Sequence, residues 1–276
     1  MFYPVYTAPL INTTAIIITR KMSLNDILSL VLAIATAMAA GLIGSFALMK
    51  RLSLAGDALS HIALPGLGLA FLLHFNPVIG GAIALFIGTF LIWKLGILSY
   101  LDTEVIVGVI FTASLAVGAL VTPEEDIVNA LFGGFGSISP MSFLTGMIIS
   151  SIVIWFVMHY RHQLVISIFS SELAQAHGVN LKQLDLLYLL AFSLTVLLGL
   201  RFLGAILVGA LIIIPAAIGR QMTHTLDYFL GSSAIAAIIS VALGFAISEY
   251  AQTDLGPTIV SVAALAFFLS LLKKRL

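Results

Sequence analysis

The chain has 276 residues, of which 61% are hydrophobic and only 9% are charged, and its formal net charge at pH 7 is zero. Soluble domains carry about 25% charged residues, so this composition excludes an ordinary soluble domain and predicts an integral membrane protein. The sequence contains no basic stretch that would favour a nucleic-acid partner, and the absence of cysteine excludes disulfides and thiolate metal sites.

Long, continuous apolar runs predict membrane-spanning helices, because the strands of a membrane barrel would alternate polar and apolar residues. Each helical span needs about 20 apolar residues, and the sequence predicts roughly nine spans, within a range of about eight to ten. The expected fold is therefore all-α, a polytopic membrane helix bundle. The predicted spans cover residues 25–48, 54–73, 78–98, 104–121, 141–159, 185–200, 203–219, 229–249 and 257–272.

The spans form one predicted domain with short terminal extensions. Residues 1–24 are expected to form an N-terminal extracytoplasmic segment, residues 25–272 a single transmembrane domain, and residues 273–276 a basic cytoplasmic tail. Basic residues prefer the cytoplasmic side of a membrane. Placing the loop with Lys50 and Arg51 inside puts nine of the twelve basic residues on that side. We therefore expect the N-terminus outside and the C-terminus in the cytoplasm.

Asp57 and His61 lie four residues apart near the start of the second predicted span, in the segment GDALSHIALPG. A charged group in hydrocarbon costs at least about 2.5–3.5 kcal/mol, so this carboxylate suggests a function. Side chains at i and i+4 share one helix face, close enough for a carboxylate and an imidazole to hold one divalent ion. The alternative interpretation is that Asp57 N-caps the helix and that His61 donates to a neighbouring helix.

Two prolines inside predicted spans are expected to kink their helices. Proline lacks the N–H that would bond the carbonyl four residues earlier, and its ring clashes with that turn. Pro65 follows His61 by one turn, so the first kink would lie beside the proposed ligand. Pro215 lies in the seventh predicted span, where the kink would mark either a hinge or a static bend.

Acidic residues gather at the expected outer end of the bundle. A negative rim concentrates cations, although such a rim could equally bind basic residues of a partner protein or be a solvated loop. His74, at the outer end of the second span, is either a secondary ligand or an interfacial polar residue. The acidic residues of this predicted outer mouth are Glu124, Glu125, Asp126, Glu249 and Asp254.

The connection between the fifth and sixth predicted spans is expected to carry a short cytoplasmic helix within about residues 168–180. Ser170 or Ser171 can cap its start, and Gly178 can end it. The sequence has no phosphate-binding loop of the form GxxxxGK[ST], so if the protein's function is driven by ATP, another chain would have to hydrolyse it. The helix either couples to that chain or is an ordinary amphipathic connector. Its predicted coupling residues are Ser171, Glu172, Leu173, Ala174, Ala176 and Gly178.

The segment GDALSHIALPG resembles the signature of the metal-type ABC importer permeases, which carry zinc, manganese or iron into prokaryotic cells. Nearly the whole chain shares the resemblance. Residues 50–54 are similar to the family's basic-then-serine loop, 131–133 to its FG segment, 202–217 to a late proline-containing span, and 256–260 to the start of its last span. One position departs from the family, which often has an aspartate where this sequence has Gln252.

The resemblance implies a type II ABC importer-like permease that forms a homodimer in the prokaryotic plasma membrane. It also implies two cytoplasmic ATP-binding subunits, an extracytoplasmic metal-binding protein, and metal contact by Asp57 and His61. The chain would be a transporter subunit rather than an enzyme, with no permanently bound cofactor and with Zn²⁺, Mn²⁺ or Fe²⁺ as its cargo. Because one pair supplies only two ligands, we expect both copies of the dimer to contribute to one site.

Other functions are compatible with a polytopic membrane chain. One is an ABC permease for a metal chelate such as a siderophore or cobalamin, which would need no ligand pair in its wall. Another is a metal channel or carrier that works without ATP. An intramembrane metalloenzyme would be expected to carry a His-Glu-x-x-His motif, which the sequence lacks.

Overall fold

The computed structural model describes residues 24–52, 54–121, 139–202, 205–223 and 225–273. All regular secondary structure within these ranges is helical. The predicted N-terminal segment, apart from its last residue, lies outside the described residues, as do Glu124, Glu125 and Asp126 of the predicted outer mouth and residues 274–276 of the tail.

The helices account for the predicted spans. Eight stretches are long and apolar enough to cross a membrane, one of them formed by α3 and α4 together, and a shorter apolar helix lies at Leu207–Met222 within α11. The prediction of an all-α membrane bundle with about nine spans is therefore confirmed. The helices are α2 (Leu24–Met49), α3 (Ala55–Ile62), α4 (Leu64–Leu72), α5 (Pro77–Leu98), α6 (Thr103–Val121), α8 (Pro140–Phe169), α9 (Ser171–Ala176), α10 (Leu181–Phe202), α11 (Ala205–Met222), α12 (Leu226–Ala251) and α13 (Leu255–Lys273).

The second predicted span consists of two helices rather than one kinked helix. α3 ends at Ile62, Ala63 separates the two helices, and Pro65 lies in the first turn of α4. A helix start tolerates proline, because the N–H that proline lacks would have no helical partner there. The predicted kink at Pro65 is thus a helix break at Ala63. By contrast, α11 is continuous through Pro215, and the bend predicted there stays a prediction.

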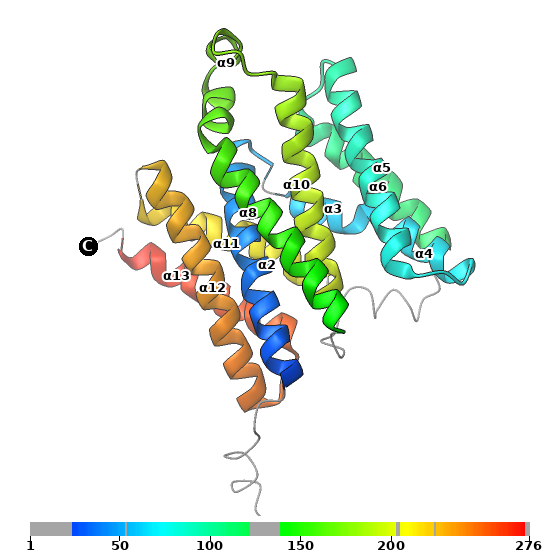
Figure 1. Ribbon diagram of the computed structural model, residues 1–276, viewed down its shortest axis with the longest axis vertical. Helices are drawn as coiled ribbons and strands as arrows, with labels where there is room; N and C mark the ends of the chain where they lie inside the picture. The colour runs from blue at the N-terminus through cyan, green and yellow to red at the C-terminus, as the bar shows by residue number, and fades with distance from the viewer. Residues whose placement is uncertain (1–23, 53, 122–138, 203–204, 224, 274–276) are drawn as a thin grey trace, which may run out of the picture.

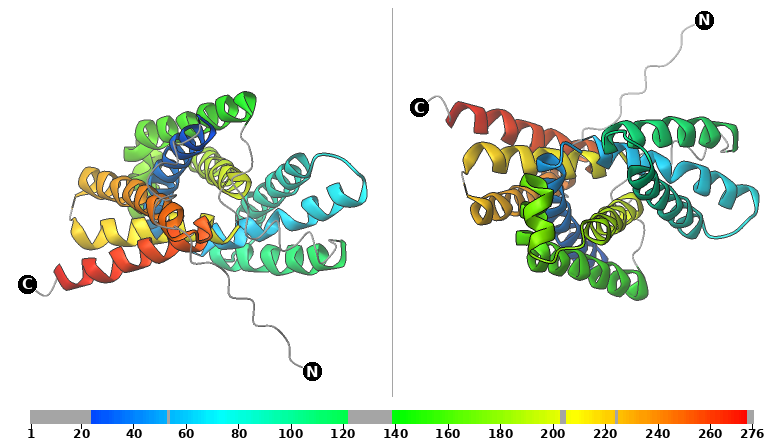
Figure 2. Two further views of the ribbon diagram at one scale, coloured as in Figure 1. Left: turned by 90° about the horizontal axis from the view of Figure 1, so that it is seen from below. Right: turned by 90° about the horizontal axis from the view of Figure 1, so that it is seen from above.

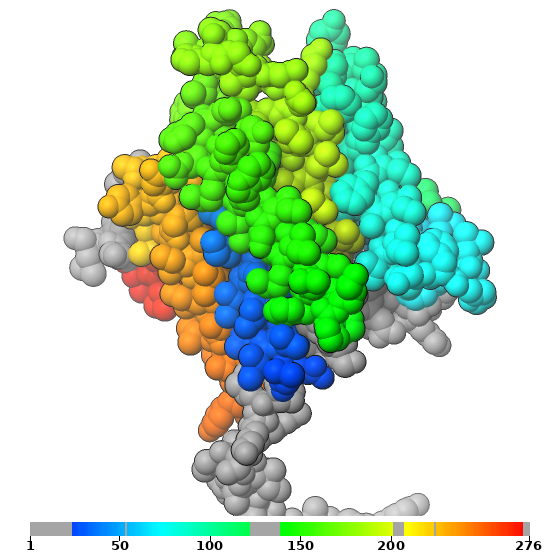
Figure 3. Space-filling view, viewed as in Figure 1, coloured from blue at the N-terminus to red at the C-terminus, as the bar shows by residue number. Residues whose placement is uncertain are grey.

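The fifth span is longer than the sequence predicts. α8 does not end near residue 159 but continues as one helix of 30 residues to Phe169. At 1.5 Å per residue its length is about 45 Å, whereas the hydrocarbon core of a bilayer is about 30 Å thick. One end of α8 therefore projects beyond the hydrocarbon. Figures 1 and 3 show α8 running to α9 at the tip of the bundle.

The helices form two groups that meet at α3 and where α5 packs against α10. Figure 2 shows α4, α5 and α6 side by side. We term these three helices the side group, and α2, α8 and α10–α13 the main group. α3 packs against α6 of the side group and against α11 of the main group. It lies near mid-height of the bundle (Figure 1).

α2 lies at the centre of the main group, where it packs against α8, α10, α11 and α12. Small residues let these helices approach closely, as is common where membrane helices pack. A methyl group at Gly44 would overlap the backbone carbonyl oxygen of Ile212 on α11. The contact between α2 and α11 therefore requires glycine at this position.

Polar contacts connect α10 to both groups. The hydroxyl oxygens of Thr89 on α5 and Ser193 on α10 lie 2.5 Å apart in the buried interior. The Tyr188 hydroxyl of α10 donates to the carbonyl oxygen of Ile43 on α2 at 3.2 Å. A buried polar group without a partner is costly, so these hydrogen bonds favour one register of α10 against its neighbours.

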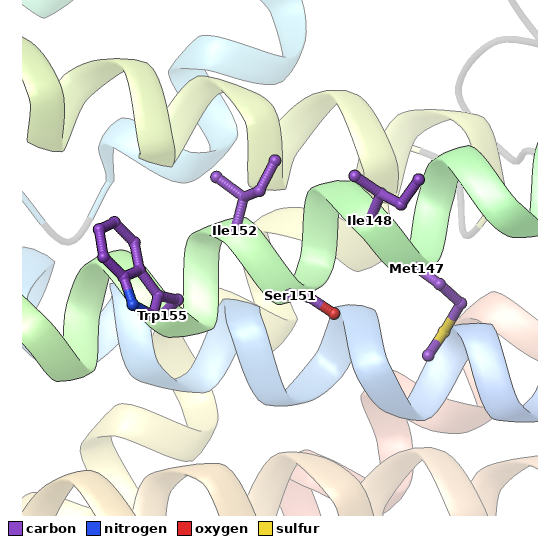
Figure 4. Close-up of a pocket in the computed structure, with 5 residues that line it drawn as sticks. All are labelled: Met147, Ile148, Ser151, Ile152 and Trp155. Carbon is purple, nitrogen blue, oxygen red and sulfur yellow. The ribbon is translucent and has the colours of Figure 1, made fainter.

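The exposed face of α8 carries a shallow apolar groove of about 370 Å³ (Figure 4). All of its lining residues come from this one helix, and none of them is ionisable. The face belongs to a span of high hydropathy, so we assign it to the lipid-facing surface rather than to a polar binding site. The lining residues are Met147, Ile148, Ser151, Ile152 and Trp155.

Candidate metal site

Asp57 and His61 lie one turn apart on α3. The helix starts at Ala55 with Leu54 as its N-cap residue, so Asp57 is inside the first turn and does not cap the helix. The Nε2 atom of His61 is 3.8 Å from the Oδ1 atom of Asp57. This distance is too long for a hydrogen bond. It falls within the separation of about 3–4 Å expected between two ligand atoms that bind the same metal ion, each at about 2.0–2.2 Å from it.

The two side chains differ in their exposure. The side chain of Asp57 is 55% exposed, whereas that of His61 is 22% exposed. Behind Asp57, α11 approaches closely, because a Cβ atom at Gly209 would lie only 3.3 Å from the Cβ of Asp57. The main group therefore supports Asp57 from behind and leaves its carboxylate accessible in front.

A cavity of about 320 Å³ opens beside Asp57, between α3 and α6. It contains a second carboxylate, Glu104, in the first turn of α6. The walls contain no basic side chain, so their two carboxylates favour a cation. Our sequence analysis missed Glu104, although an acidic residue at the start of a predicted span is a usable signal. The lining residues are Leu52, Leu54, Ala55, Asp57, Ala58, Glu104, Val107, Gly108 and Phe111.

The imidazole of His61 packs against an aromatic ring from the side group. Its ring centroid lies 5.6 Å from that of Phe111 on α6, and the ring planes are inclined by 58°. The Nδ1 atom of His61 is buried and has no hydrogen-bond partner among the described residues. Phe111 also lines the cavity beside Asp57. Sequence reasoning missed this contact, because an aromatic residue in an apolar span carries no signal beyond ordinary packing.

The other predicted ligands do not join this pair. His74 lies between α4 and α5, and Asp254 lies between α12 and α13; both are exposed, as is Glu249 near the end of α12. None of the three lines the cavity beside Asp57. Within the described part of the chain, no group of three or more histidine, cysteine, aspartate or glutamate side chains could hold a metal ion. One copy of the chain thus offers Asp57 and His61 as two adjacent ligands.

A short helix, α9, lies where the sequence predicts one. The Ser170 hydroxyl accepts a hydrogen bond from the backbone N–H of Leu173 at 3.2 Å and caps the helix start. Gly178, just beyond the helix end, has a φ of 77°, which favours glycine. Ala174 is buried, whereas Leu173 is 58% exposed. Glu172 and Ala176 are exposed too. α9 lies at the tip of the bundle (Figure 1), and its exposed Leu173 gives it an apolar side chain there.

Two sequence relatives have transport-related names. The chain is 30% identical over 238 residues to the high-affinity zinc uptake system membrane protein ZnuB of Haemophilus influenzae, covering 84% of this chain and 91% of that protein. It is 28% identical over 248 residues to the manganese transport system membrane protein MntC of Listeria monocytogenes, covering 88% and 89% of the two chains. Both alignments thus extend over most of each protein.

A solved structure and a family match agree with these relatives. The fold is similar to a chain in the structure of PsaBC from Streptococcus pneumoniae in complex with Fab, with a TM-score of 0.77 and 25% identity over 90% of this chain and 91% of that one. Residues 26–274 match the ABC 3 transport family. The resemblance on which the sequence analysis relied is confirmed, and this chain belongs to the ABC 3 transport family.

Proposed function

We propose that the protein is the membrane-spanning permease subunit of an ATP-driven importer for a divalent transition metal ion, namely zinc, manganese or ferrous iron. The observation that carries this proposal is the Asp57–His61 pair, whose ligand atoms lie 3.8 Å apart on a helix between two helix groups. One oxygen and one nitrogen ligand suit all three metals. The names of relatives that transport zinc or manganese add support.

The metal site is completed, in this proposal, by a second copy of the chain. A two-fold axis would bring Asp57 and His61 of both copies together, giving two oxygen and two nitrogen ligands, which is a four-coordinate set for zinc. Water would fill further positions for manganese. The accessible carboxylate of Asp57 supports this arrangement, because it can be reached from outside its own chain. Ligands divided between two subunits separate easily, which suits transient binding.

The distribution of charge supports an orientation with α9 in the cytoplasm. Successive spans alternate in direction, so the ends of α2, α5, α8 and α11 and the start of α10 lie at one face, together with α9. Basic side chains at this face agree with the preference of lysine and arginine for the cytoplasm. The N-terminus would then be outside, in a prokaryotic plasma membrane. The basic residues are Lys50, Arg51, Lys94, Arg161, Lys182 and Arg220.

We further propose that α9 docks on a cytoplasmic ATP-binding subunit, one for each copy of the permease. Replacing Leu173 with aspartate is expected to weaken this association and to reduce metal uptake at least about tenfold, because a charge would replace an apolar side chain at the interface core. The exposed position of Leu173 means that α9 itself should persist. Co-purification of the two subunits and ATP-dependent uptake measure the effect.

Gln175→Asp is the matched control for this substitution. It places the same charge on α9 at another exposed position, without removing an apolar contact, and should leave subunit association largely intact. Association and uptake by Leu173→Asp at the level of Gln175→Asp would contradict docking through this side chain.

Reconstitution tests the proposed function as a whole. Proteoliposomes containing the permease, its ATP-binding subunit and the extracytoplasmic metal-binding protein are expected to accumulate radioactive zinc or manganese only when ATP is supplied. Flux of free metal without ATP or the ATP-binding subunit would favour a channel or carrier instead. Uptake of a metal chelate, with no uptake of the free ion, would favour the chelate permease.

A further inference from the structure

We propose that Phe111 is a positioning residue that holds the imidazole of His61 in the orientation needed to bind the metal. This inference depends on the proposed function, because it assigns a role within the same site. Phe111 does not itself offer a ligand atom, so it would act only through His61.

Metal-binding histidines usually need a second contact. In most sites the ring nitrogen that does not bind the metal donates to a carboxylate, a carbonyl or a water, and this bond fixes the orientation of the ring. In His61 the Nε2 atom faces Asp57. The Nδ1 atom is buried and finds no such acceptor in the described structure. No protein acceptor of the described structure therefore fixes the ring, and a contact with a neighbouring aromatic ring is the one available to restrict it.

Phe111 supplies that contact. Its ring centroid lies 5.6 Å from that of His61 in a tilted arrangement, and favourable aromatic pairs have centroids about 4.5–7 Å apart. Phe111 also borders the cavity beside Asp57, whereas His61 is not among the lining residues. Removing the Phe111 ring would enlarge this cavity and would let the imidazole of His61 turn away from Asp57.

The two ligands are supported from opposite helix groups. Phe111 belongs to α6 of the side group, whereas Gly209, behind Asp57, belongs to α11 of the main group. Both ligands belong to α3, so a displacement of α6 would act on the imidazole only through its contact with Phe111.

The test is Phe111→Ala in the reconstituted transporter. Loss of a group that orients a metal-binding histidine typically weakens metal affinity about 10–100-fold, so the KM for zinc should rise at least about tenfold, with a much smaller change in kcat. Nitrogen ligands matter less to manganese, which accepts oxygen and water, so its KM should rise less. Phe111→Tyr keeps the ring, and the adjoining cavity can receive the hydroxyl, so it should restore both KM values.

Two further variants separate positioning from general packing. Ile110→Ala truncates a neighbouring buried side chain of α6, and it should leave the ratio of the zinc KM to the manganese KM unchanged. Phe111→Leu keeps apolar volume without the ring and replaces the alanine variant if that variant does not assemble. The role of Phe111 would be overturned if the ratio of the zinc KM to the manganese KM did not change in Phe111→Ala or Phe111→Leu. It would also be overturned if that ratio changed equally in Ile110→Ala.

Asp57→Ala, compared with the Phe111 variants, distinguishes an incorrect positioning role from an incorrect metal site. If Asp57→Ala abolishes uptake while Phe111→Ala and Phe111→Leu behave as the wild type, only the positioning role is wrong. If Asp57→Ala transports normally, the proposed metal site is wrong, and the positioning role is wrong with it.

Discussion

Replacing Asp57 or His61 with alanine is expected to abolish metal uptake while leaving the permease assembled. In a site shared by two copies, each substitution removes two of four protein ligands, which leaves too few for a transition metal. Assembly should survive, because the Asp57 side chain is largely exposed and His61 Nδ1 makes no hydrogen bond within the described structure. Uptake by proteoliposomes and size-exclusion chromatography of the complex measure the two properties.

Ser60→Ala is the matched control within α3. Ser60 lies beside His61, but its hydroxyl bonds the carbonyl oxygen of Gly56 in the same helix and it does not line the cavity beside Asp57. Its removal should therefore leave uptake close to the wild-type rate. Full uptake by both Asp57→Ala and His61→Ala would show that the metal does not use this pair.

Gly44→Ala is expected to destabilise the folded bundle severely. The added methyl group would overlap the backbone carbonyl oxygen of Ile212, and a backbone atom in a packed helix cannot rotate away as a side chain can. Overpacking commonly costs about 1–3 kcal/mol and occasionally more, and we expect a value at or above about 3 kcal/mol here. The thermal unfolding midpoint in detergent and the yield of monodisperse protein measure the loss.

Gly231→Ala provides the comparison, because a Cβ atom there would have no neighbouring atom within 4 Å. Its effect should range from neutral to a stabilisation of about 1 kcal/mol, because alanine favours a helix interior more than glycine does. The Gly44 variant is also informative for function, since the displaced helix, α11, carries Gly209 behind Asp57. Equal unfolding midpoints for the two alanine variants would contradict the close contact of α2 and α11.

Local sequence signals determined the membrane spans, the spacing of the ligand pair and the short helix α9. Apolar runs of about 20 residues predict the spans wherever they occur, because a helix is the form in which a single segment satisfies its own backbone in lipid. The spacing of Asp57 and His61 places them one turn apart in any helix. The short helix α9 follows from Ser170 and Gly178, whose capping and left-handed conformations are properties of single residues.

Some local signals were insufficient even for helix boundaries. The proline at position 65 indicates an interruption, but the break falls at Ala63, because proline fits the first turn of the following helix. Nothing in the polar residues after position 159 indicates that α8 continues to Phe169. A helix that leaves the membrane keeps its own hydrogen bonds while its composition changes, so hydropathy marks the membrane boundary and not the end of the helix.

Only the tertiary structure showed what surrounds the ligand pair. Glu104, Phe111 and Gly209 lie far from Asp57 and His61 in sequence, and packing of α3 between α6 and α11 brings them together. In a soluble protein, the apolar stripe of a helix would indicate its buried face. In a membrane, lipid and protein interior are both apolar, so the sequence of a span gives little indication of which face contacts another helix. The residues that surround the site are therefore determined only by how the helices pack.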